Sequence, residues 1–276
     1  MEQKILFLDL DGTLLNDRKE ITPGNRRTIG QALARGHRIV VTSGRPTKSS
    51  LAQAERLGLA GEGCYVIAYN GGTVYDCSRG RLIHREALEP EVLYRVYDEA
   101  ARRNVYIQTY DREDVVIEPR CDEANARRYC AAIGLDWRRI ENVRRDLSQP
   151  PVKALLIDYQ DREALEDMER WLKAELSGRL DCFFSSRYFL EVVPVGVNKG
   201  SAVQALCRQL GIDVQNAVAA GDESNDVSMI RAAGVGVAMA NAIPAAKEAA
   251  DYVTQNDNNH DGIAEVIHRF LLYTVS

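Results

Sequence analysis

Near its start the chain reads Lys4-Ile-Leu-Phe-Leu-Asp9-Leu-Asp11-Gly-Thr13, and this stretch decides how the rest is interpreted. A short apolar run that ends in acid is typical of a strand covered on both faces, with its carboxyl end at an edge where ligands bind. Residues i and i+2 of an extended chain point the same way, so we expect Asp9 and Asp11 to converge on one patch. Two such carboxylates repel each other unless a cation joins them or one is protonated.

Four further apolar runs follow this pattern, at residues 38–42, 64–69, 217–220 and 235–239. Helical patterns alternate with them. Thr22-Pro23 and Pro46 open two helices, residues 200–210 and 227–233 form two more, and the last follows Asp261, which we expect to cap it. Alternation of this kind predicts an α/β fold: a Rossmann-like parallel sheet core with helices on both faces.

The middle of the chain has a different pattern. Residues 105–117 and 182–193 each read as a strand hairpin, and a helix at 123–133, a strand at 152–158 and a helix at 161–176 lie between them. We therefore predict an inserted α+β domain at residues 84–189, with the core formed by residues 1–83 and 190–276.

The composition excludes several classes of protein. Of the 276 residues, 45% are hydrophobic and 27% charged, as in ordinary globular proteins. The net charge of -5 argues against a sequence-independent nucleic-acid binder, which needs basic surface. No run approaches the roughly 18 apolar residues of a membrane span, and the first residues lack the features of a signal peptide.

Six cysteines are present, and none of them lies in a C-x-x-C pair. Several sit inside apolar runs, so we expect buried free thiols rather than a zinc site. Free thiols indicate a reducing compartment, which makes the cytoplasm the expected location.

The fourth apolar run is followed by a second acidic cluster, Gly221-Asp222-Glu-Ser-Asn225-Asp226. Taken alone, this cluster is equally consistent with an exposed turn and helix cap. Gathered with Asp9 and Asp11, it brings about four negative charges together, which is costly when they are buried and unpaired. A magnesium ion would remove two charges and Lys199 one. Because Mg²⁺ prefers a few carboxylates plus water and phosphate oxygens, the pattern indicates phosphoryl chemistry.

Two loops have the composition of phosphate-binding turns. Ser43-Gly44-Arg45 follows the second apolar run and offers a hydroxyl, backbone N–H groups and a guanidinium. Asn70-Gly71-Gly72 follows the third run, and its glycines permit close approach of the backbone. Neither loop is a Walker A motif, which argues against a nucleotide-driven motor.

In this order the motifs resemble those of the haloacid dehalogenase-like superfamily. The resemblance rests on Asp9-x-Asp11-Gly-Thr, the Ser43 loop, Lys199 and Gly221-Asp222-x-x-Asn225-Asp226. Their spacing is similar to that of the Cof-type phosphatases, which carry a large α/β cap between the second and third motifs. The resemblance covers nearly the whole chain, is weakest over the cap, and implies that the inserted domain selects the substrate.

The resemblance implies a role for each motif residue. Asp9 would be the nucleophile, and Asp11 would protonate the leaving alcohol and then activate water. Magnesium would be held by Asp9, the Asp11 backbone carbonyl and Asp222. Ser43 would bind the phosphoryl group, Lys199 would steady Asp9 and the phosphate, and Asp226 would act behind them, on water or on Lys199. Residues 12–21 would form a flap beside the nucleophile. The remaining candidate substrate-binding residues are Gly44, Arg45, Asn70, Gly71 and Asn225.

The implied activity is hydrolysis of small phosphorylated metabolites, with sugar phosphates as the expected substrates. Two alternatives share these motifs: a sugar phosphomutase and a non-catalytic sugar-phosphate sensor. Arg187 and Tyr188 are candidates for contact with substrate, although exposed hairpin residues would look the same. The sequence leaves the particular substrate and the oligomeric state open.

Overall fold

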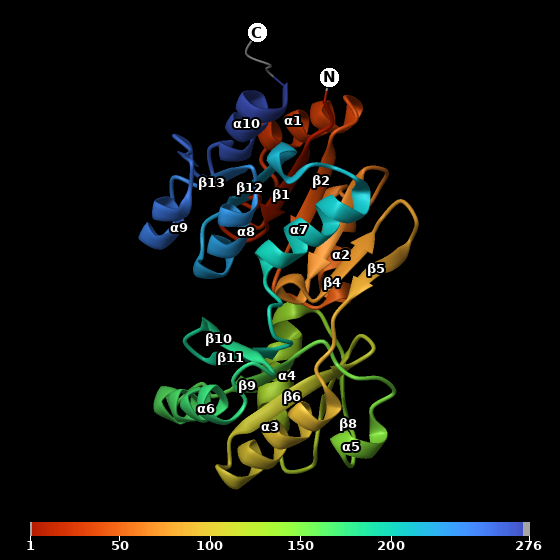
Figure 1. Cartoon of the computed structure of the whole chain (residues 1–276), viewed down its shortest axis with the longest axis vertical. Coiled ribbons are helices and arrows are strands. Elements are labelled where there is room, and N and C mark those ends of the chain that lie inside the picture. Colours follow the sequence, from red (N-terminus) through yellow and green to blue (C-terminus); the bar gives the residue numbers. More distant parts are fainter. Residues whose placement is uncertain (1, 273–276) are drawn as a thin grey trace. The chain divides into compact units, whose positions relative to one another are not determined.

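The structure is a computed structural model that describes residues 2–272. The chain forms two compact units (Figure 1). The first runs to His84 and resumes at Asn198, and the second is the continuous segment Arg85–Val197. The boundary that we expected between residues 189 and 190 cuts a strand, β11 (Phe189–Val193), that pairs on both sides within the second unit. All of β11 therefore belongs to the second unit, and the boundary between the units lies at residues 197 and 198.

An eight-stranded sheet organises the first unit, in the order β14-β13-β12-β1-β2-β3-β4-β5. All the pairs from β14 to β3 are parallel, and β4 runs antiparallel to β3. The strands are β1 (Ile5–Asp9), β2 (Arg38–Thr42), β3 (Cys64–Ala68), β4 (Thr73–Asp76), β5 (Arg81–Arg85), β12 (Ala217–Gly221), β13 (Val235–Ala238) and β14 (Tyr252–Val253). All five apolar runs are thus strands, whereas β4, β5 and β14 were not predicted.

Helices cover both faces of this sheet, as expected (Figure 1). Alternate residues of β1 show why: Leu6 and Leu8 pack toward α1 and α10, while Ile5 and Phe7 pack toward α7. The helices are α1 (Pro23–Ala34), α2 (Thr47–Leu57), α7 (Lys199–Leu210), α8 (Val227–Ala232), α9 (Pro244–Ala249) and α10 (Gly262–Ile267). A π turn, His268–Leu272, continues α10.

The expected cap of the last helix is wrong. Asp261 precedes α10 but its side chain makes no capping hydrogen bond there. Its carboxylate instead accepts the Asn25 backbone N–H at 3.0 Å and the Thr22 hydroxyl, so it serves the start of α1. The carboxylate satisfies free N–H groups of a different helix, one that is its neighbour only in the folded chain.

The second unit is an α+β fold with a six-stranded sheet, in the order β10-β11-β9-β6-β7-β8. Both predicted hairpins are present, as β6–β7 and β10–β11. The remaining strands are β6 (Tyr106–Asp111), β7 (Asp114–Ile117), β8 (Trp137–Arg139), β9 (Ala154–Ile157) and β10 (Asp181–Ser186). The helices are α3 (Pro90–Arg102), α4 (Glu123–Ile133), α5 (Val143–Asp146) and α6 (Arg162–Glu175). We did not predict α3, β8 or α5.

A buried ion pair lies within the second unit. Lys153 Nζ lies 2.6 Å from Glu191 Oε2, and the two side chains are 1% and 6% exposed. The Ser185 hydroxyl donates to Glu191 Oε1 at 2.7 Å, and Lys153 lies over the Tyr110 ring. One positive and one negative group thus neutralise each other inside the unit.

The structure also bears on two inferences from composition. All six cysteines are free, and four of them are buried. Within residues 2–272 there is no helix with the length and apolar content needed to cross a membrane.

Candidate active site

The site is assembled at the carboxyl ends of neighbouring parallel strands in the first unit. Asp9 ends β1, Ser43 follows β2, Asn70 follows β3 and Asp222 follows β12. Because these strands run in one direction, their carboxyl ends share one edge of the sheet, where α/β proteins bind ligands.

One lysine and three carboxylates form the centre of the site. Lys199 Nζ lies 2.5 Å from Asp9 Oδ1 and also contacts Asp226 Oδ1. One carboxylate oxygen from each of Asp9, Asp222 and Asp226 lies within 4.8 Å of the others. Lys199 and Asp226 are fully buried. Counting formal charges, the cluster carries three negative groups against one positive group.

Local hydrogen bonds hold these side chains in place. Lys199 is the first residue of α7, whose start is fixed by a capping box between Asn198 and Ser201. Asp226 uses its second oxygen, Oδ2, to accept the backbone N–H groups of Asp222 and Glu223, each at 3.0 Å. Asp226 therefore ties the β12 loop to the lysine.

The pKa values of the clustered side chains reflect the close approach of their charges. Burial, together with Asp226 and despite the nearby Lys199, raises the pKa of Asp9 to about 8. Burial also raises the pKa of Asp222 to about 6, with Asp226 and Glu223 adding to it. Burial alone would lower the pKa of Lys199, but Asp226 and Asp9 outweigh it and raise that pKa above its ordinary value. Both carboxylates thus resist ionisation in the absence of a further cation.

Two residues that follow β1, Gly12 and Thr13, lie against the Asp222 carboxylate. The Thr13 hydroxyl donates to Asp222 Oδ1 at 2.7 Å. Gly12 has a φ of +80°, and a Cβ at this position would lie only 2.3 Å from Asp222 Oδ2. Only glycine therefore fits between the first acidic motif and the last.

The Asp11 carboxylate is paired with two cations and is not part of the cluster of three carboxylates. Its Oδ1 lies 2.7 Å from Lys19 Nζ and its Oδ2 lies 2.8 Å from Arg45 Nη2, and the side chain is 41% exposed. Partial burial alone would raise the pKa of Asp11, yet Lys19 and Arg45 together lower it. The two predicted roles of Asp11, as acid and as carbonyl ligand, remain predictions.

The two predicted phosphate loops lie against each other. The Ser43 carbonyl accepts the Asn70 N–H at 3.0 Å, and Ser43 Oγ accepts the Arg45 N–H at 3.1 Å. Asn70 Oδ1 accepts from Asn225 Nδ2 at 3.2 Å, while Asn70 Nδ2 is buried and makes no hydrogen bond to any described residue. This amide lies beside Gly44, and its free donor is suited to an anionic oxygen.

Gly71 is required by a different contact. Its φ is +112°, and a Cβ there would lie 2.3 Å from the backbone oxygen of Asn198. The third strand's loop therefore packs directly on the start of α7, which carries Lys199.

The donor set fits magnesium. Asp9, Asp222 and Asp226 offer only carboxylate oxygens, the hard ligands that Mg²⁺ prefers, and their raised pKa values show that a cation would relieve repulsion. The three-carboxylate cluster contains Asp226, which we had placed behind the ligands, and does not contain the Asp11 carboxylate.

Comparison with known proteins identifies the family. The model of the haloacid dehalogenase-like hydrolases matches residues 6–267, so the chain belongs to this family and the resemblance is confirmed. Bacillus subtilis (strain 168) YxeH is 33% identical over 271 residues, covering 98% of both chains. The 5-amino-6-(5-phospho-D-ribitylamino)uracil phosphatase YcsE of the same bacterium is 29% identical, covering 98% of this chain and 96% of that protein. A solved haloacid dehalogenase-like hydrolase from Bacteroides thetaiotaomicron is 35% identical with a TM-score of 0.86, covering 97% and 99%.

Some residues with a part in the site were not singled out from sequence. The Asp9-x-Asp11-Gly-Thr motif contains Thr13, but the motif alone does not show that its hydroxyl reaches Asp222. Lys19 carried no signal, because its partner Asp11 is reached through a turn with a φ of +61° at Lys19 itself. Arg187 and Tyr188 lie in the second unit, at the turn between β10 and β11, where Tyr188 is 37% exposed.

Proposed function

We propose that the protein is a magnesium-dependent phosphatase that hydrolyses small phosphorylated metabolites through an aspartyl-phosphate on Asp9. The observation that carries this proposal is the contact of the buried Lys199 with Asp9 inside an acidic cluster that one lysine cannot neutralise. The names of relatives such as YcsE, the 5-amino-6-(5-phospho-D-ribitylamino)uracil phosphatase, support phosphate-ester hydrolysis as the reaction class.

In the first step the Asp9 carboxylate attacks the phosphorus atom, and the bond to the alcohol oxygen breaks. Lys199 holds one oxygen of Asp9 and so leaves the other for attack. Asp11 donates a proton to the departing alcohol. In the second step Asp11 takes a proton from water, whose oxygen attacks the phosphorus and releases phosphate and free Asp9.

Asp11 must be protonated to act as the acid, and its neighbours explain how substrate would arrange this. Lys19 and Arg45 hold Asp11 ionised in this structure. A phosphate dianion arriving at the Ser43 loop competes for both cations, because a charge-assisted bond to phosphate is strong. Release of Asp11 beside that anion raises its pKa and favours the protonated acid.

Asp9 and Asp222 would hold the magnesium ion, with Asp226 or the Asp11 carbonyl beside them. When bound, Mg²⁺ supplies positive charge that offsets the transferring phosphoryl group. Ser43 and the unpaired Asn70 Nδ2 would bind phosphoryl oxygens from the other side.

Hydroxylated phosphate esters, sugar phosphates among them, are the substrates that we propose, with the second unit as the selecting domain. YcsE, by its name, acts on a phosphorylated ribityl compound, which supports an ester of a polyhydroxylated chain. We place the reaction in the cytoplasm, which is consistent with six free thiols.

The decisive experiment is phosphate release from a panel of sugar phosphates, with magnesium and with EDTA. We expect release with magnesium and almost none in chelator. Asp11→Asn should slow turnover strongly, and acid-quenched protein should retain phosphate on Asp9 when the ester has an activated leaving group. An isomerised sugar phosphate without phosphate release would instead identify a mutase, and binding without any turnover would identify a sensor. Full activity in EDTA would contradict the role of magnesium.

A further inference from the structure

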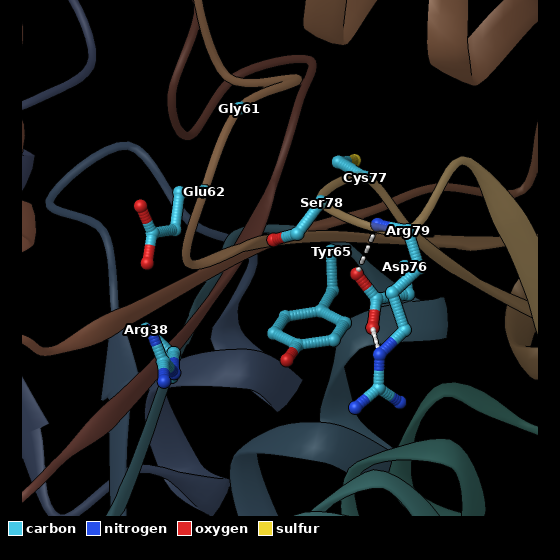
Figure 2. Close-up of a pocket in the computed structure, with 8 residues that line it drawn as sticks. All are labelled: Arg38, Gly61, Glu62, Tyr65, Asp76, Cys77, Ser78 and Arg79. Atoms are coloured by element: carbon cyan, nitrogen blue, oxygen red, sulfur yellow. Dashed lines mark hydrogen bonds and ion pairs between the residues drawn. The ribbon is translucent and has the colours of Figure 1, made fainter.

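A pocket separate from the candidate active site lies in the first unit, at the amino end of the parallel strands (Figure 2). Its volume is about 480 Å³, which is enough for a small metabolite. Arg38 is the first residue of β2, Tyr65 is near the start of β3, and Asp76 ends the antiparallel β4. Asp9, Ser43 and Asp222 lie at the carboxyl ends of their strands. This pocket therefore lies at the opposite end of the strands from the catalytic carboxylates.

Tyr65 gives the pocket a hydroxyl donor that no described residue uses. The residue is only 6% exposed, and its hydroxyl points into the middle of the pocket in Figure 2. No hydrogen bond joins this hydroxyl to any of residues 2–272, although Tyr65 is surrounded by polar side chains. The hydroxyl faces the open pocket and is not one of the buried unpaired polar atoms, so its donor is available to a bound acceptor.

Arg38 gives the pocket a guanidinium that is not engaged in an ion pair. Its guanidinium faces the same space as the Tyr65 hydroxyl, and it forms no ion pair with any described residue (Figure 2). The second arginine of the lining differs: Arg79 Nε lies 3.7 Å from Asp76 Oδ2, and the Arg79 backbone N–H donates to Asp76 Oδ1 at 3.1 Å. Because Glu62 and Asp76 balance the two arginines of the lining, the pocket favours a ligand with a single anionic group and additional donors over a phosphate dianion.

Acceptors complete the lining. Asp76 is buried beside Tyr65, and the exposed Glu62 lies at the pocket edge (Figure 2). Both carboxylates accept hydrogen bonds from hydroxyl or ammonium groups. The pocket thus combines a recognition point for one anion with recognition points for donors.

We propose that this pocket is a non-catalytic binding site for a small carboxylate that also bears hydroxyl or ammonium groups. The ligand carboxylate accepts from the Arg38 guanidinium and the Tyr65 hydroxyl, and its donors bind Asp76 and Glu62. This site is independent of the phosphatase proposal, because none of its residues belongs to the acidic cluster.

Calorimetric titration of the full chain with three probes tests the proposal: D-glycerate, L-serine and glycerol. None of them is a phosphate ester, so turnover does not interfere and failure of the phosphatase proposal would not affect the result. We expect at least one of the two carboxylates to bind and glycerol not to bind; comparison of D-glycerate with L-serine identifies which donor is preferred. Arg38→Gln should weaken binding about tenfold or more, and Tyr65→Phe about threefold to tenfold.

Arg231→Gln serves as the matched control, since Arg231 is an exposed arginine on α8, outside the pocket, and this variant should bind like wild type. Tyr65→Phe removes only an unpaired hydroxyl and should fold normally, which guards against misreading an unfolded Arg38 variant. Absence of binding by both carboxylates at about 10 mM would overturn the proposal. Equal binding by wild type, Arg38→Gln and Tyr65→Phe would also overturn it.

Discussion

Each unit buries one lysine against carboxylates, and the two arrangements differ in charge balance. In the second unit Lys153 faces one carboxylate, that of Glu191, at 2.6 Å. In the first unit Lys199 meets Asp9 and Asp226, with Asp222 close by. The Lys199 cluster sets one positive group against three negative groups, whereas the Lys153 pair sets one positive group against one negative group.

The difference separates a structural ion pair from a site. Glu191 raises the pKa of Lys153 against the opposing effect of burial, so that pair is complete within the protein. In the Lys199 cluster burial raises the pKa values of Asp9 and Asp222, and Asp226 adds to both, because one lysine cannot compensate three clustered carboxylates. Unbalanced buried charge of this kind is typical of places that bind ions or substrates.

The largest expected effect tests the unbalanced cluster. Asp9→Asn should lower phosphate release by about 10⁴-fold, because an amide of the same shape cannot attack phosphorus. The fold should persist, since one charge is removed from a crowded acidic group. Steady-state phosphate release and circular dichroism measure both. Asp213→Asn, at an exposed position before β12, is the control and should be active; retention of more than about 1% activity by Asp9→Asn would exclude Asp9 as the nucleophile.

The balanced pair should respond in stability. Glu191→Gln removes the negative charge that faces the buried Lys153 ammonium, so we expect a loss of about 3–5 kcal/mol in the free energy of unfolding of the second unit. Both tryptophans, Trp137 and Trp171, lie in this unit, so urea unfolding followed by tryptophan fluorescence reports on it specifically.

The control for that measurement is Glu175→Gln. Glu175 faces Arg95 at 3.7 Å in an exposed pair, so its loss should cost at most about 1 kcal/mol. The double variant Lys153→Met with Glu191→Leu should recover most of the stability lost by Glu191→Gln. Equal effects of Glu191→Gln and Glu175→Gln would remove the contrast between the two lysines.

In the unbalanced cluster the same kind of substitution should stabilise the metal-free protein. The folded-state pKa of Asp222, about 6, exceeds its ordinary 3.8, so stability falls as pH rises from about 4 to about 6, and the full penalty for ionising Asp222 is present above pH 6. Asp222→Asn should therefore raise the free energy of unfolding in EDTA at pH 8 by about 1–3 kcal/mol, and this gain should vanish below about pH 4.

Hydrogen exchange of the β12 amides is the appropriate readout for the first unit. Magnesium should slow this exchange in wild type and have a smaller effect on Asp222→Asn, because binding to the folded state stabilises it. Faster β12 exchange in Asp222→Asn than in wild type at pH 8 would contradict this prediction. It would show that the protein already compensates the negative charge of the Asp222 carboxylate.

The smallest expected effect concerns Asp11. Lys19 helps to lower the pKa of Asp11, so Lys19→Gln should raise that pKa and keep the acid protonated to higher pH. The alkaline limb of kcat/KM should move upward by about half a pH unit, since the pair is exposed. Arg18→Gln, which removes a neighbouring exposed cation, should leave the profile in place.

The regular elements were predictable because their signals are local. Helix α4 has the predicted bounds, Glu123–Ile133, since Asp122 caps its start and Gly134 takes the left-handed conformation at its end. Helix α3 was missed although Pro90 opens it and its apolar residues have helical spacing. Strand β4 was not predicted, because it begins directly after the glycine turn at Gly71-Gly72.

The contacts that complete the site depend on residues distant in sequence. Asp261 was expected to cap its own helix, and only the packing of α1 beside α10 shows that it serves Asn25. Likewise the Thr13–Asp222 hydrogen bond joins residues 209 apart. Motif order identifies which carboxylates gather, whereas their partners require the folded chain.

The order in which the strands are synthesised determines when the sheet of the first unit can be completed. Strand β1 lies between β2 and β12, yet β12 leaves the ribosome about 10–40 s after β1 at ordinary rates of 5–20 residues per second. Until then one edge of β1 has no partner and Asp9 has no lysine, since Lys199 follows 190 residues later. The second unit is continuous in sequence and is translated in full during this interval. The nascent chain therefore carries an incomplete sheet whose central strand β1 has one unpaired edge until β12 is synthesised.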